Sequence, residues 1–295
     1  MSYRVHYRTE GDAQADCSDV NARSALFDLY GDHLLSRGGV ARVASLVQLM
    51  SALDVAAPAV RTAVSRMVSQ GWLERTVVAG SPAYRLTPRA ERRLREAAAR
   101  IYRTDDVPWD GNWHLISIDR VADRVRRDRL RSGLMYLGYA QLRDNTWISP
   151  HASAEAASLL EAERVSARRF TARYDGVDAA LTAEAWDLDA LAAAYANWLT
   201  EARGALAGLG DGRSQTGAAH GPDRREDADR RAFVVRSRLV HEWRKFLFRD
   251  PGLPRDLLPE DWPGDAAARF FDEQASRLMP AAGRYVEACL GREVR

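Results

Sequence analysis

The chain has 295 residues, 28% of them charged, and a formal net charge of +2 at pH 7. This length is more than one small hydrophobic core usually organises, so we expect two or three domains. The sequence has no run of about twenty apolar residues and no apolar signal segment near its start, which argues against a membrane-spanning helix and a secretory signal. We therefore expect a cytoplasmic protein that does not bind a membrane.

The residues that usually mark catalytic or metal sites are scattered along the chain. Cys17 and Cys289 lie near opposite ends and are expected to be thiols rather than a disulfide or a zinc site. The six histidines have no spacing typical of metal ligands or acid–base pairs. There is no glycine-rich phosphate loop and no nucleophile-elbow motif. The sequence thus predicts no catalytic residue, no metal and no cofactor.

The N-terminal region has the element order of a winged helix-turn-helix. We expect a flexible tail over residues 1–22 and a DNA-binding domain over residues 23–104. Apolar residues at helical spacing predict helices over 24–37 and 40–53, and a third helix that begins near Pro58. Two strands joined by an AGSP turn follow, and then a further helix for which Thr87 is the expected cap. This order is typical of a DNA-binding domain.

The third helix, within VRTAVSRMVSQGWLE, has one apolar and one polar side. In a helix-turn-helix the second helix of the turn lies in the major groove. There, arginine forms bidentate hydrogen bonds with guanine, and hydroxyl groups reach bases or phosphates. The predicted DNA contacts are Arg61, Thr62, Ser65, Arg66 and Ser69, with Arg75 and Arg85 on the strands as phosphate contacts.

The charge around this helix favours a site for a polyanion. Residues 56–103 contain ten arginines and three glutamates, an excess of seven positive charges. The alternatives are a solvated helix surface and a winged helix that docks another protein.

The middle of the chain predicts a ferredoxin-like domain over residues 105–176. Its expected elements follow the order β-α-β-β-α-β and begin with the strand WHLISI. Asp119 stands at the end of this strand, where a lone carboxylate is more typical of a turn than of a metal-dependent nuclease. We expect the sheet to join two protomers, and a nucleic-acid-processing protein is the alternative interpretation.

Residues 177–295 predict an all-helical C-terminal domain. Within it, residues 210–232 contain no large apolar side chain. This stretch therefore buries too little apolar surface to offset the entropy lost on ordering. We expect a mobile loop over residues 207–230. The chain as a whole is predicted to be an α+β multidomain protein.

Several motifs together resemble one known family. They are FDLYGDHLLSRGG, VRTAVSRMVSQGWLE, WDGNWHLISI, LGYAQLRDNTWISPH and LVHEWRKFLFRDPGLPRDLLPEDWPG, spread over residues 22–290. The chain resembles the PaaX family of bacterial transcriptional repressors, which regulate phenylacetate catabolism. The resemblance implies a homodimer that binds a partly palindromic operator, with Arg61, Thr62, Ser65 and Arg66 on the recognition helix. It also implies release from DNA by an aryl-acyl-CoA, typically phenylacetyl-CoA.

An acyl-CoA effector needs cations for its phosphates and apolar walls for its acyl and adenine groups. The segment HEWRKFLFR mixes these two residue types. The alternatives are that its aromatic residues form helix-packing core and that its cations are solvated or paired; an enzyme acting on acyl-CoA is a further one. The residues predicted to bind the effector are His241, Trp243, Arg244, Lys245 and Arg249.

Overall fold

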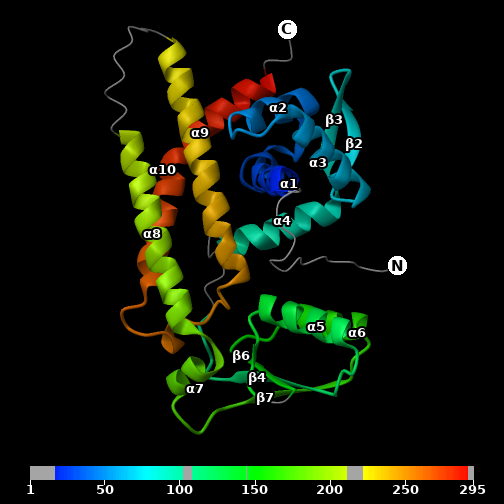
Figure 1. Cartoon of the computed structure of the whole chain (residues 1–295), viewed down its shortest axis with the longest axis vertical. Coiled ribbons are helices and arrows are strands. Elements are labelled where there is room, and N and C mark those ends of the chain that lie inside the picture. Colours follow the sequence, from blue (N-terminus) through cyan, green and yellow to red (C-terminus); the bar gives the residue numbers. More distant parts are fainter. Residues whose placement is uncertain (1–16, 102–107, 144, 211–221, 292–295) are drawn as a thin grey trace. The chain divides into compact units, whose positions relative to one another are not determined.

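The computed structural model (Figure 1) describes four stretches of the chain, residues 17–101, 108–143, 145–210 and 222–291. These stretches form two compact units. The first unit contains the described residues up to 98, residues 222–241 and residues 274–291, and the second unit contains the remainder. Residues of the predicted C-terminal domain therefore contribute to both units.

The first unit is built mainly from the N-terminal part of the chain. Because its first helix starts at Cys17, residues 17–22 of the predicted tail are helical, and residues 1–16 lie outside the described part. A π-helical turn (Tyr30–Leu34) and a 3-10 turn (Leu35–Arg37) follow that helix. The main elements are α1 (Cys17–Leu29), β1 (Val40–Arg42), α2 (Val43–Ser51), α3 (Ala57–Ser69), β2 (Leu73–Val78), β3 (Ser81–Leu86) and α4 (Pro88–Ile101).

The sheet of the first unit has three strands where the sequence predicts two. Its order is β1-β3-β2, with antiparallel neighbours, and Val40 pairs with Arg85. The predicted helix over 40–53 is therefore wrong at its start, because its first three residues extend to complete the sheet before α2 begins. Ala79 and Gly80 join β2 to β3 with φ of 47° and 79°, as a two-residue hairpin turn requires.

The second unit contains the predicted ferredoxin-like domain. Its strands pair antiparallel in the order β5-β6-β4-β7, and α5 and α6 cover one face of this sheet (Figure 1). Ile116, Leu134 and Trp147 are buried in the core of this domain. The elements are β4 (Trp113–Ile118), α5 (Arg124–Tyr136), β5 (Ala140–Gln141), β6 (Thr146–Ser149), α6 (Ala154–Ala162) and β7 (Ala167–Ala172). The predicted order β-α-β-β-α-β is confirmed.

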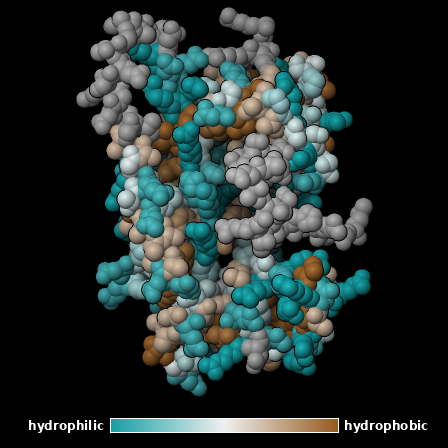
Figure 2. Space-filling model, in the orientation of Figure 1, coloured by the Kyte–Doolittle hydropathy of each residue, from teal (hydrophilic) through white to brown (hydrophobic). Residues whose placement is uncertain are grey.

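The outer surface of this domain includes an exposed edge strand and an exposed helix. β7 lies at one end of the strand order, and every residue of β7 after Ala167 is exposed, including Phe170 at 52%. The surface over α5 is mostly hydrophilic with hydrophobic residues among the polar ones (Figure 2): Arg124, Arg127 and Arg131 are exposed, and so are Val125 and Met135.

The C-terminal part is helical, as predicted. The mobile loop expected over residues 207–230 is wrong at both ends, since α8 continues to Gly210 and α9 begins at Pro222; the residues between them lie outside the described part. A proline suits a first helical turn, and opposite charges four residues apart, such as Glu226 and Arg230, favour helix without an apolar core. The helices are α7 (Asp178–Ala185), α8 (Leu188–Gly210), α9 (Pro222–Arg244) and α10 (Pro263–Gly291).

The core of the first unit fixes α3 by its apolar side. Val60 and Met67 are fully buried and belong to a cluster that includes residues of α1, α2, α9 and α10. Pro58 lies in the first turn of α3, as predicted. Thr87 caps α4, also as predicted, because its Oγ1 accepts a hydrogen bond from the backbone N–H of Ala90 at 3.2 Å. These contacts leave the opposite side of α3 facing outward.

Candidate nucleic-acid interface

The polar side of α3 is exposed over its whole length. The helix has 13 residues, which at 1.5 Å per residue gives about 20 Å, and a major groove about 12 Å wide admits such a helix. The apolar residues that alternate with the polar ones are buried. All five residues predicted to contact DNA from this helix are exposed: Arg61, Thr62, Ser65, Arg66 and Ser69.

The hydroxyl groups on this side have different environments. Ser69 Oγ donates a hydrogen bond to the carbonyl oxygen of Arg66 at 2.9 Å, so this hydroxyl closes the last turn of α3. Thr62 and Ser65 lie closer to the N-terminal end of the helix. That end is the one from which helix-turn-helix proteins usually contact base edges.

The two arginines predicted on the strands do not form one site. Arg75 on β2 pairs across the hairpin with Tyr84, whereas Arg85 on β3 pairs with Glu74. Residues paired across two strands share a face and successive residues alternate between faces, so Arg75 and Arg85 lie on opposite faces of the hairpin. Both are exposed, but a duplex lying against one face meets only one of them.

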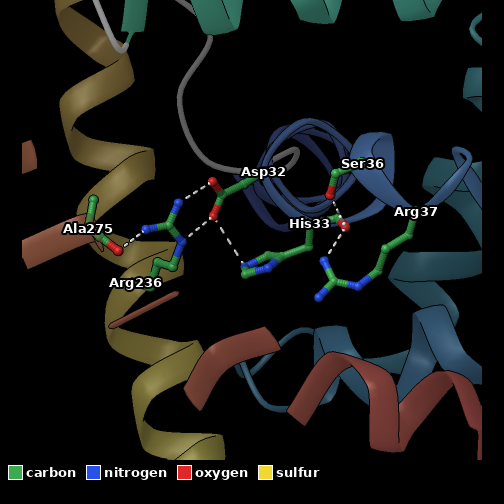
Figure 3. A network of polar contacts seen from close by, with 6 residues as sticks. All are labelled: Asp32, His33, Ser36, Arg37, Arg236 and Ala275. Atoms are coloured by element: carbon green, nitrogen blue, oxygen red, sulfur yellow. Dashed lines mark hydrogen bonds and ion pairs between the residues drawn. The ribbon is translucent and has the colours of Figure 1, made fainter. Parts of the chain in front are cut away.

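A buried polar network joins α9 and α10 to the turn after α1 within the first unit (Figure 3). Arg236 on α9 is 1% exposed. It donates from Nε to Asp32 Oδ2 at 2.8 Å and from Nη2 to Asp32 Oδ1 at 2.6 Å. Its Nη1 donates to the carbonyl oxygen of Ala275 on α10. This bidentate arrangement is the strong form of an arginine–carboxylate pair, so it ties three helical segments at one point.

His33 lies beside this pair on the π-helical turn (Figure 3). Its Nε2 is 3.2 Å from Asp32 Oδ2, and its ring contacts Phe233 with a centroid distance of 5.3 Å. Burial lowers the pKa of His33 to about 4; the charge of Asp32 opposes this shift and the charge of Arg236 reinforces it. The imidazole is therefore neutral at pH 7.

The aromatic and imidazole residues predicted for the effector have structural partners. His241 Nδ1 lies 2.7 Å from Asp28 Oδ2, within the first unit. In the second unit Trp243 is 4% exposed, stacks on Phe271 with a centroid distance of 4.8 Å, and donates from Nε1 to the carbonyl oxygen of Ile101. These contacts give both side chains a role in packing.

The predicted cations are more accessible. Lys245 Nζ lies 2.5 Å from Glu242 Oε2, and both side chains are exposed. Arg244 is half-buried and Arg249 is exposed. The cations are thus the members of the predicted effector set that a phosphate group reaches most easily.

Asp119, the carboxylate at the end of β4, is exposed and pairs with Arg168 on β7 at 3.5 Å. Asp119 directly follows β4, which neighbours β7 in the sheet, so this pair links the two strands where β4 ends. Within the described residues, no group of three or more His, Cys, Asp or Glu side chains is arranged to hold a metal ion.

Sequence patterns did not identify Asp32 and Arg236 as partners. They are 204 positions apart, and only the fold brings them together. The one signal in the sequence is an arginine within the apolar stretch AFVVRSRLV, since an arginine at a core-facing helix position needs a buried acceptor.

Comparisons with known proteins agree on one family. Three family models match: PaaX-like protein at residues 21–90, PaaX protein central Cas2-like domain at residues 106–182, and PaaX-like protein C-terminal domain at residues 186–288. The chain is 29% identical to "Transcriptional repressor PaaX" of Escherichia coli K12 over 279 residues, which is 90% of this chain and 83% of that protein.

A solved structure is similar along nearly the same length. The uncharacterized protein Rv0674 from Mycobacterium tuberculosis is 26% identical, with a TM-score of 0.58, over 91% of this chain and 98% of that chain. No helix in the described part of this chain is both long enough and apolar enough to span a bilayer. The three matched domains, in this order and with these folds, show that the chain belongs to the PaaX family of transcriptional repressors.

Proposed function

We propose that this protein is a dimeric transcriptional repressor that binds operator DNA through its winged helix and is released by an acyl-CoA thioester. The observation that carries the proposal is the division of α3 into two sides. Its apolar side is buried in the first unit, and its exposed side bears only arginines, hydroxyls and other small or polar groups. A helix held in this way is suited to the major groove.

The geometry suggests separate roles for the exposed residues. Arg61, Thr62 and Ser65 lie in the first two-thirds of α3 and are proposed to contact base edges. Arg66 and Ser69, near its end, are proposed to contact the DNA backbone. Of the two strand arginines, only the one on the face of the hairpin turned toward the duplex is proposed to contact a phosphate.

The exposed β7 edge supports a dimer formed through the central domain. An edge strand presents unpaired backbone donors and acceptors, and a second copy of the strand satisfies them by antiparallel pairing. Phe170, 52% exposed in the middle of β7, gives this edge an apolar contact. Two protomers joined here would present two recognition helices to two half-sites of the operator.

Release by an acyl-CoA is proposed from the family resemblance and from the cations at the end of α9 and just after it. Lys245 and Arg249 are exposed, and Arg244 is half-buried. Helix α9 also carries Arg236, which holds the turn after α1 through Asp32. A ligand that favours a different position of α9 lowers the affinity for DNA, because the coupling between two ligands is reciprocal.

The test is a footprint on the DNA upstream of the protein's own gene, repeated with CoA, acetyl-CoA and phenylacetyl-CoA. The proposal expects a protected palindrome that one aryl thioester abolishes and free CoA does not. Release of free CoA from the thioester would instead indicate an enzyme. Metal-dependent cleavage of the DNA or of RNA, lost in Asp119→Ala, would indicate a nuclease.

A further inference from the structure

Two arginines outside the recognition helix stack on a pair of aromatic rings in the first unit. The guanidinium carbon of Arg23, on α1, lies 5.6 Å from the ring centre of Phe27. The guanidinium carbon of Arg89, on α4, lies 5.0 Å from the ring centre of Trp72. The two rings meet edge to face, with centroids 5.0 Å apart and an interplanar angle of 87°. We call these four residues the arginine–aromatic row.

The aromatic rings hold the two guanidinium groups in place. Phe27 and Trp72 are half-buried and pack against the core of the first unit. The backbone carbonyl of Trp72 also accepts a hydrogen bond from the N–H of Thr87 at 3.1 Å, which links the end of α3 to the start of α4. A guanidinium that is already stacked loses less freedom when it binds an anion, so the arginines are prepared for such a ligand.

The charge at the row is positive and lies next to the recognition helix. Burial lowers the pKa of Arg23, and the nearby charge of Arg66 on α3 adds to this shift. Two acidic residues on the same helices have other partners: Asp28 bonds His241 at 2.7 Å, and Glu91 bonds Arg95 at 3.1 Å. An anion placed between α1 and the end of α3 therefore relieves repulsion between arginines.

We propose that Arg23 and Arg89 are phosphate-binding residues that grip the DNA backbone beside the C-terminal half of α3 without reading sequence. The inference rests on the proposed DNA-binding function and adds residues that the sequence pattern of α3 does not indicate. Their flat guanidinium groups lie against rings on α1 and just before β2, outside the helix proposed to enter the groove. Phosphate is the part of the duplex that they are placed to meet.

The test measures binding to two labelled duplexes of equal length, the upstream region and an unrelated sequence, at several salt concentrations. Each neutralised phosphate contributes about 0.9 to the slope of log affinity against log salt concentration. At 0.1 M salt, one such contact raises the affinity about eightfold relative to 1 M salt. Arg23→Gln and Arg89→Gln are each expected to lose about this much per bound protomer on both duplexes. Arg95→Gln, on the same helix as Arg89, removes an arginine that pairs with Glu91; it is the matched control and is expected to bind as the native protein does.

Lysine variants separate charge from folding. Arg23→Lys and Arg89→Lys keep the charge and are expected to keep the salt slope. A slope that drops equally in the lysine variants would overturn the inference, as would glutamine variants that bind both duplexes with native affinity and slope. A loss confined to the upstream duplex would also overturn it, because it would mark base contacts.

Failure of this inference is distinguishable from failure of the proposed function. If the native protein binds neither duplex, the DNA-binding function itself fails. If the native protein prefers the upstream duplex and Arg61→Ala reduces that preference, while both glutamine variants match the native protein, only the arginine–aromatic row is refuted.

Discussion

Arginine has two opposite uses in the first unit. On α3, Arg61 and Arg66 are exposed and belong to the side that faces away from the core. On α9, Arg236 is 1% exposed and its guanidinium donates to Asp32 and to the backbone of Ala275. Exposed charges contribute little to folding but remain available to a ligand, whereas a buried pair is costly to break. The difference predicts which substitutions change stability and which change DNA binding.

The largest effect is expected for Arg236→Met, because it leaves the Asp32 carboxylate buried without its cation. Breaking a buried pair in this way costs about 3–5 kcal/mol of unfolding free energy. Urea denaturation followed by circular dichroism measures this loss. The matched control is Arg238→Gln on the same helix, whose ion pair with Asp54 is mostly exposed and is expected to contribute less than about 1 kcal/mol.

A double variant tests the same buried pair more closely. Adding Asp32→Leu to Arg236→Met removes the stranded charge and should recover part of the lost stability, since replacing both partners costs less than removing one. An Arg236→Met protein as stable as the native one would show that the buried pair does not hold these helices together.

The next effect concerns pH. The pKa of His33 is about 4 in the folded protein, below its ordinary value of 6.5. Between these values the unfolded chain binds a proton that the folded chain does not, so stability is highest above pH 6.5 and falls as pH drops toward 4. Over this pH range the unfolding free energy falls by about 3 kcal/mol. His33→Leu should flatten this part of the stability curve.

The difference between the native and His33→Leu curves is the informative quantity. Burial also lowers the pKa of His114 and of His151, so these residues add to the acid dependence of both proteins. Parallel curves for the two proteins between pH 6.5 and 4 would contradict the buried, neutral state of His33.

Substitutions of the exposed arginines are expected to change the free energy of DNA binding rather than that of unfolding, and by a smaller amount. Because Arg61 is proposed to contact a base, Arg61→Ala should weaken binding to the upstream DNA by about 1–3 kcal/mol, whereas Arg66→Ala, at a proposed backbone contact, should weaken binding to upstream and unrelated DNA alike. The free energy of unfolding should change little. Fluorescence anisotropy measures the DNA affinity, and urea denaturation of the same preparations measures the stability. Equal weakening on upstream and unrelated DNA by Arg61→Ala would mark Arg61 as a phosphate contact instead.

The smallest effect is expected at the hairpin. Because Arg75 and Arg85 lie on opposite faces, only one of Arg75→Ala and Arg85→Ala should weaken DNA binding, by about 1 kcal/mol for one lost phosphate contact. The same anisotropy assay measures this difference. Equal losses in both variants would show that the duplex does not lie against one face of the hairpin.

Local patterns were enough to predict some of these features. The spacing of apolar residues predicts the two sides of α3, and Pro58 and Thr87 mark helix starts because their roles depend only on close neighbours. The element order of the ferredoxin-like domain follows from patterns of the same local kind.

Features that depend on distant partners were missed. Residues 40–42 continue the apolar pattern of α2, and only pairing with β3 makes them a strand. The contact between Arg236 and Asp32, and the stacking of Arg89 on Trp72, require tertiary structure. The predicted effector residue Trp243 illustrates the same limit, because an aromatic beside cations has one sequence pattern whether it lines a ligand site or fills a core.

The most direct test of the account is the affinity of the native protein, Arg61→Ala and Arg66→Ala for the DNA upstream of the gene, with unrelated DNA as the competitor. The account predicts that the native protein prefers its upstream DNA and that at least one variant loses this preference while unfolding at the native urea concentration. Native discrimination between the two DNAs in both variants would contradict the claim that the exposed side of α3 recognises the operator.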